Sequence, residues 1–195
     1  MFPPDSNTRK QWWLCCYGVT SMEKTIATCQ QLVAICDTNQ HPLFPSLAVA
    51  AHCFYARPFK NSKAVGRLSD EFLLPKQIGI HKWIMAFRDG VFSHIDASES
   101  RIAGRAMHDV VYSNDGNDQM FSTSDPLPRP SAYSKVSAQA KLVREVLVKR
   151  VSVFHETHGD LIPDDDGHFL LSLSTATPLF VPYTAPQQSI ALHYE

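Results

Sequence analysis

Hydrophobic residues recur every three or four positions in several stretches of the chain, the spacing that places them along one face of an α-helix. The clearest stretch covers 134–158, where apolar side chains keep this step throughout and Gly159 follows as a stop signal. Another stretch, 21–38, begins at the N-cap candidate Ser21 and ends in a polar run. Prolines delimit a third stretch, 45–57, and a pattern interrupted by Pro75 covers 71–96. The spacing therefore predicts four helices.

Strand signals occur near 105–113, where valine and tyrosine precede an NDGND turn, and near 168–174, in the run HFLLSLS. A proline-rich linker, 124–131, precedes the fourth helix, and the segment 175–195 contains three prolines typical of an extended tail. Short connections between the first three helices favour antiparallel neighbours. The predicted fold is mostly α, a four-helix up-and-down bundle with a small β addition. Residues 1–19 are expected to form an N-terminal extension, 20–174 a single helical domain and 175–195 the tail.

Composition narrows the possible functions. The chain of 195 residues is 44% hydrophobic, enough for a core, and its formal net charge of −1 differs from the basic character of duplex-DNA binders. Any RNA contact must therefore be local. No apolar run has the length of a membrane span or the form of a secretory signal, so we expect a soluble, cytoplasmic protein without membrane contact.

The five cysteines all lie within the first 53 residues and lack the spacing of zinc ligands. Cys29 and Cys36 share a helix face and are interpreted as buried thiols, with a disulfide or metal role as the alternative. We therefore expect neither a metal site nor a cofactor.

The end of the third predicted helix, FRDGVFSHIDA at 87–97, combines Arg88, Asp89 and His94. Two interpretations are open. In the structural one, cationic side chains stabilise the helix C-terminus through its dipole. In the functional one, an arginine binds a phosphate while a histidine exchanges a proton.

The run RDGVFSH, 88–94, resembles the signature of the HEPN superfamily, helical-bundle proteins of bacterial toxin–antitoxin and phage-defence systems. The resemblance implies a metal-independent endoribonuclease acting on RNA phosphodiesters. Arg88 would bind the phosphate, His94 would act as acid or base, and Asp89 would orient them. It also implies an antitoxin or nucleotidyltransferase as a possible partner. The alternative is a catalytically inert HEPN-like module for dimerisation or partner binding, which Asp89 in place of the commoner asparagine favours.

Arg88 and His94 are six residues apart, which separates them by about 120° around an ideal helix. In the resembled family two protomers bring both motifs to one cleft, so the resemblance predicts a homodimer. Arg57 either pairs with Asp89 or Asp96 or lines the same cleft. His81 either assists RNA binding or is a polar surface histidine. The basic residues of the fourth helix form either a solvated face or an additional RNA contact.

Overall fold

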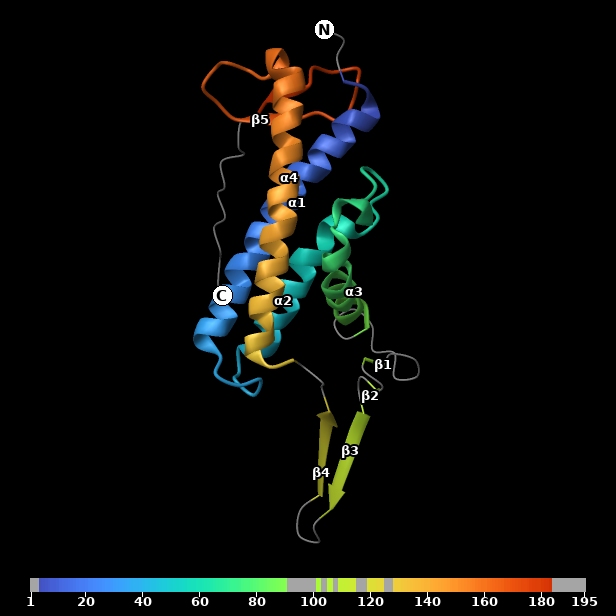
Figure 1. Cartoon of the computed structure of the whole chain (residues 1–195), viewed down its shortest axis with the longest axis vertical. Helices are drawn as coiled ribbons and strands as arrows, with labels where there is room; N and C mark the ends of the chain where they lie inside the picture. The colour runs from blue at the N-terminus through green and yellow to red at the C-terminus, as the bar shows by residue number, and fades with distance from the viewer. Residues whose placement is uncertain are drawn as a thin grey trace, which may run out of the picture.

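In a computed structural model of the chain, the backbone is described for residues 4–90, 101–102, 105–106, 109–114, 119–124 and 128–183, and side-chain surroundings for 4–89 and 128–183. The described part is mostly helical, with a small β component, as the sequence predicted. Its four α-helices are α1 (Ser6–Ile35), α2 (Phe44–Ala56), α3 (Pro75–Gly90) and α4 (Tyr133–His158) (Figure 1). Short 3-10 turns, namely η1 (Arg57–Phe59), η2 (Asp70–Phe72), η3 (Pro130–Ala132) and η4 (Gly159–Leu161), flank them.

Helix α1 begins fifteen residues earlier than the predicted start at residue 21, so the N-terminal extension expected for 1–19 is instead largely helix. Asp5 caps it, since its carboxylate accepts a hydrogen bond from the backbone N–H of Thr8 at 2.7 Å. Trp12 and Leu14 are buried in this first part of the helix. The segment belongs to the core, since Trp12 stacks on Phe154 of α4 with ring centroids 3.8 Å apart.

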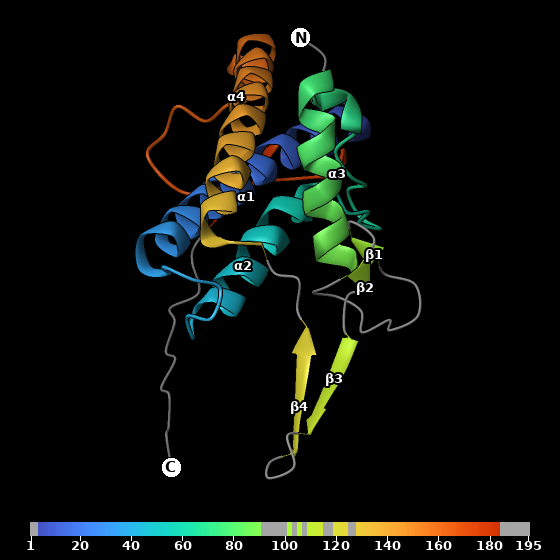
Figure 2. The same ribbon diagram turned by 60° about the horizontal axis from the view of Figure 1, so that its bottom comes forward.

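Successive helices run in opposite directions, with α1 packed against both α2 and α4 (Figure 1). Helix α3 lies at the edge, against α2 and α4 (Figure 2). Gly18 allows a close approach of α1 to α4, because a Cβ there would lie 2.7 Å from Leu147 Cδ1. The predicted third helix, 71–96, differs from the observed α3 at its start, where a 3-10 turn precedes Pro75. Residues 91–96 lie outside the described residues.

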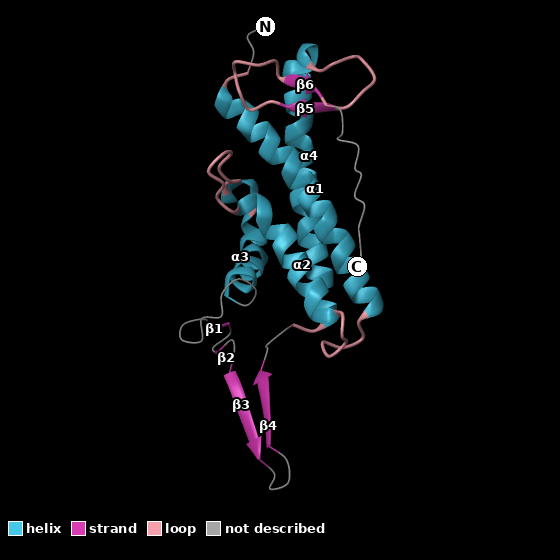
Figure 3. Ribbon diagram, turned by 180° about the vertical axis from the view of Figure 1, so that it is seen from behind, coloured by secondary structure: helices cyan, strands magenta, loops and turns pink. Residues whose placement is uncertain are grey.

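The described strands form antiparallel two-stranded pairs (Figure 3). Strand β1 (Arg101–Ile102) pairs with β2 (Arg105–Ala106), β3 (Asp109–Asn114) with β4 (Gln119–Ser124), and β5 (Phe169–Leu171) with β6 (Phe180–Pro182). The sequence analysis anticipated strands near β3 and β5 but not their partners β4 and β6. Strand β6 lies within the expected tail and packs on α1, since the ring of Phe180 meets Trp12 edge-on at 5.2 Å. Residues 184–195 of that tail are outside the described part.

The core lies between the four helices and contains aliphatic, aromatic and thiol side chains. Cys29 and Cys36 are both buried and free, which confirms their interpretation as buried thiols. Burial raises the pKa of the Cys29 thiol to about 12, so this sulfur stays protonated and unreactive. Within the described ranges, no helix is both long and apolar enough to cross a membrane.

Candidate functional site

Arg88 and Asp89 lie at the C-terminal end of α3, where the carboxylate of Asp89 sits between two cations. Arg88 Nη1 donates a hydrogen bond to Asp89 Oδ1 at 2.8 Å, and Lys60 Nζ donates one to Asp89 Oδ2 at 2.5 Å. Partial burial by itself raises the pKa of Asp89, but the hydrogen bonds from Lys60 and Arg88 outweigh it and leave the pKa below its ordinary value. The ionised carboxylate thus ties the end of α3 to the residue that follows η1.

His94, the proposed proton-transfer residue, lies outside the described residues, as does Asp96. Two statements therefore remain predictions: the separation of His94 from Arg88 around the helix, and the pairing of two protomers.

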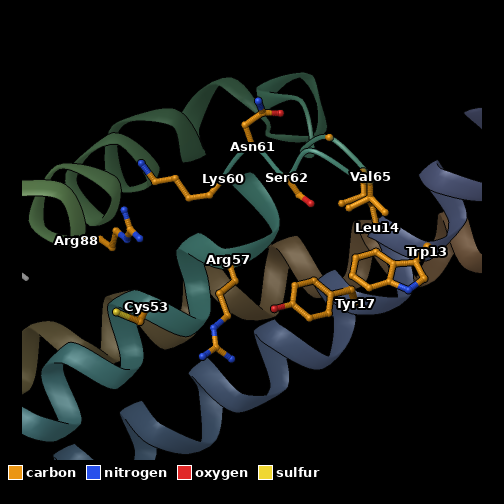
Figure 4. A pocket seen from close by; sticks show the side chains of 11 residues that line it. Trp13, Leu14, Tyr17, Cys53, Arg57, Lys60, Asn61, Ser62, Val65 and Arg88 are labelled. Carbon is orange, nitrogen blue, oxygen red and sulfur yellow. The ribbon is translucent and has the colours of Figure 1, made fainter. Parts of the chain in front are cut away.

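Arg88 also lines a pocket of about 450 Å³ formed by α1, α2, α3 and the segment after η1 (Figure 4). Its lining residues are Trp13, Leu14, Tyr17, Cys53, Arg57, Lys60, Asn61, Ser62, Val65, Gly66 and Arg88. Three of these are cationic and none is a carboxylate, although Asp89 borders the pocket through its contacts with Lys60 and Arg88. A local positive field of this kind attracts anions even though the formal net charge of the chain is −1.

Arg57 and Arg88 line this same pocket, one of the two arrangements that the sequence left open for Arg57. The guanidinium of Arg57 lies over the ring of Phe54, with its Cζ 4.9 Å from the ring centroid. Asp89 makes its ion pairs with Lys60 and Arg88 instead. Arg57 is exposed, and its guanidinium points away from Lys60 and Arg88 (Figure 4).

An aromatic pair from α1 forms another part of the pocket wall. Trp13 and Tyr17 are one helical turn apart and stack with ring centroids 4.9 Å apart and planes inclined by 14°. Sequence reasoning missed both residues because it placed 1–19 outside the helical domain. The i,i+4 spacing of two aromatic residues was the signal that could have identified them. Lys60 was missed as well, since it begins a polar connection without a periodic pattern.

His81, a weaker candidate for RNA binding, does not line this pocket. Its side chain is 4% exposed, so the expected surface position is wrong. Its Nδ1 lies 3.2 Å from the hydroxyl of Tyr55, which also accepts a hydrogen bond from Gln139 at 3.2 Å. Burial lowers the pKa of His81 although nearby Asp70 opposes this. His81 therefore belongs to a buried polar network that joins α2, α3 and α4.

The basic side of α4 is partly engaged in structural contacts. Arg144 forms an ion pair with Glu23 of α1 at 2.8 Å, and Arg150 lies over the ring of Phe72 at 4.3 Å. The lysines of this side, Lys135, Lys141 and Lys149, are exposed. These contacts favour the interpretation of a solvated helix face.

Within the part of the chain that the structure describes, no group of three or more histidine, cysteine, aspartate or glutamate side chains is arranged to hold a metal ion. No protein-family model, no curated protein and no solved structure matches this chain. The functional argument therefore depends on the geometry of the pocket and on the motif that borders it.

Proposed function

We propose that this chain is an HEPN-like helical-bundle protein that cleaves RNA phosphodiesters without a metal ion, in a toxin or phage-defence role. The observation that carries the proposal is that Arg57, Lys60 and Arg88 line one pocket whose described lining residues include no carboxylate. Arg88 is both a member of this cationic group and the first residue of the RDGVFSH motif. An RNA phosphate is the kind of anion that such a group binds.

The proposed reaction uses the RNA itself as the nucleophile. The ribose 2′-oxygen attacks the adjacent phosphorus, the bond from phosphorus to the 5′-oxygen breaks, and a cyclic phosphate and a free 5′-hydroxyl are left. His94 takes the proton of the 2′-hydroxyl as a base and then, as an acid, gives it to the leaving 5′-oxygen. Arg88 stabilises the negative charge that grows on the phosphoryl oxygens, with Arg57 and Lys60 adding to the field.

The proposed active form is a homodimer, because two motifs would then border one composite cleft and bring Arg88 of one copy near His94 of either copy. Sedimentation velocity at micromolar concentration tests this directly. A monomer that nevertheless cleaves RNA would refute the composite cleft.

The competing proposal is an inert dimerisation or partner-binding module with the same fold. The observation that favours it is the carboxylate of Asp89, which engages both Lys60 and Arg88 and reduces the charge available to a phosphate. In this alternative the motif is an ion-paired clamp between α3 and the segment after η1.

RNA cleavage by the wild type, by His94→Ala and by Arg88→Lys separates the two proposals. Loss of an acid–base residue lowers the rate by roughly two to four orders of magnitude. Arg88→Lys keeps the charge but loses the planar donor pair, so we expect a loss of roughly 10- to 100-fold. Arg144→Lys on α4 is the matched control, because it makes the same exchange in an ion pair outside the pocket.

Melting temperatures of all variants are measured in parallel, and the cleavage assay contains a chelator. If the wild type leaves every tested RNA intact while all variants remain folded, the ribonuclease proposal is wrong and the inert module is supported.

A further inference from the structure

The pocket beside Arg88 has two chemically different ends (Figure 4). Arg57 begins η1, Lys60 follows η1 and Arg88 lies at the end of α3. The charged ends of Lys60 and Arg88 lie near each other on one side of the pocket, and the Arg57 side chain points away from them. Trp13 and Tyr17 of α1, together with Val65 of the loop after η1, lie toward the other side. A phosphate requires the first kind of surface and a flat apolar ring requires the second.

Trp13 and Tyr17 form an aromatic pair that, unlike the adjacent Trp12, lies at the pocket and not in the core. Trp12 is 4% exposed and stacks on Phe154 with ring centroids 3.8 Å apart, so it belongs to the core. Trp13 and Tyr17 are half-buried, stack on each other and line the open pocket. A flat ring bound in this pocket would therefore meet aromatic side chains.

Two polar residues, Asn61 and Ser62, lie between the cationic and the aromatic ends of the pocket. Asn61 and Ser62 line the pocket and are exposed, so an amide and a hydroxyl face the solvent side. Such groups exchange hydrogen bonds with ribose hydroxyls or with a base edge. The pocket volume of about 450 Å³ lies within the range of small-molecule sites, roughly 300–1,000 Å³.

We infer that Trp13 and Tyr17 form a nucleobase subsite, so that the pocket takes one phosphorylated nucleoside with its base on the aromatic pair and its phosphate at the cationic end. This inference rests on the proposed function for the role of the cationic end. The nucleoside belongs either to an unpaired position of an RNA strand or to a free nucleotide. A base inside a duplex is excluded because its two faces are already covered by neighbouring bases.

Intrinsic tryptophan fluorescence distinguishes base stacking from phosphate binding. The His94→Ala full-length chain is titrated with a short single-stranded RNA, its duplex, AMP and inorganic phosphate, so that cleavage does not disturb the measurement. Single-stranded RNA and AMP should quench the fluorescence. Inorganic phosphate should compete for the cationic end without quenching, and the duplex should bind more weakly than the single strand.

Tyr17→Leu and Trp13→Leu remove a ring while keeping an apolar side chain, and each should weaken binding of single-stranded RNA by roughly 5- to 100-fold. Tyr183→Leu is the matched control, since Tyr183 is an exposed aromatic outside the pocket. Arg57→Gln should weaken RNA, AMP and phosphate binding together. Circular dichroism verifies that each variant keeps its helical content.

The outcomes separate this inference from the proposed function. If RNA is cleaved, and if Arg57→Gln weakens RNA binding while Trp13→Leu and Tyr17→Leu do not, the base subsite is refuted and the ribonuclease proposal is supported. If AMP quenches the fluorescence and the aromatic variants abolish this, while no RNA is bound or cleaved, the subsite stands as a free-nucleotide site and the ribonuclease is refuted. If neither RNA nor AMP binds, both proposals are refuted.

Discussion

His52 should make the stability of this protein fall as the solution is acidified from neutral pH. The residue is buried on α2, and its Nδ1 lies 3.1 Å from the carbonyl oxygen of Ile84. Because a carbonyl can only accept, Nδ1 carries the proton and donates it. The rings of Trp83, Phe87 and Tyr133 have centroids within 5.7 Å of the imidazole. Burial lowers its pKa from 6.5 to about 4, although the bond to Ile84 opposes the shift.

The direction of the effect follows from proton uptake. Below pH 6.5 the unfolded chain binds a proton at His52, whereas the folded chain remains neutral down to about pH 4. The stabilisation is therefore fully present above the unfolded pKa and is lost as the pH falls toward the folded pKa. Integrating this difference from pH 7 to pH 5 gives a loss of about 2 kcal/mol from this one group.

The variant His52→Gln keeps a side-chain N–H donor and removes the titration. Urea unfolding of wild type and variant at pH 7 and pH 5 gives the two free energies of unfolding at each pH. The wild type should lose about 2 kcal/mol more than the variant over this interval. His168→Gln, at an exposed position just before β5, measures what removal of a surface histidine does. If wild type and His52→Gln lose the same free energy, the assignment of His52 as a buried neutral imidazole is wrong.

Further predictions concern one glycine in each of α1 and α3 and a buried arginine of α1. Gly18→Ala should destabilise the fold by about 1–3 kcal/mol, because its Cβ would lie 2.7 Å from a methyl of the fully buried Leu147. In contrast, a Cβ at Gly79 would have no neighbouring atom within 4 Å, so Gly79→Ala should stabilise α3 by about 0.4–1 kcal/mol. Thermal unfolding of the pair checks both signs, and a stabilised Gly18→Ala would contradict the close approach of α1 to α4. Arg9→Met should cost roughly 1–3 kcal/mol in urea unfolding, because the buried guanidinium donates to backbone carbonyls of Pro4 and of the segment around Ser172; an unchanged midpoint would show that these carbonyls find other donors.

The helical class was predictable because helix periodicity is a local property. Helix α4 could be read from its repeating apolar step, and α2 from the prolines at its ends. The first half of α1 was not predictable in this way. Its run WWLCCY is apolar on several faces, since Trp12 packs on α4 and β6 while Trp13 lines the pocket. A residue pattern with one apolar face does not describe a helix that has neighbours on two sides.

Some residues of the candidate site could be identified from the sequence and others could not. Arg88 and Asp89 could be identified from a short contiguous motif, and Arg57 was considered as a neighbour. Lys60 carries no local signal for binding, because it lies in a polar connection without periodicity. Trp13 and Tyr17 have only their i,i+4 spacing as a local signal, and they are tens of residues away from the motif in the sequence.

By itself, the sequence determined the helical class, the buried thiols and the motif that contains Arg88 and His94, since these depend on residues close together in the chain. The tertiary structure decided which groups meet. Packing of α1, α2 and α3 places an aromatic pair and three cations around one pocket. It also buries His81 in a polar network and brings Lys60 to the carboxylate of Asp89. These outcomes depend on contacts between distant segments, and local residue patterns do not encode which distant side chains will share a cavity.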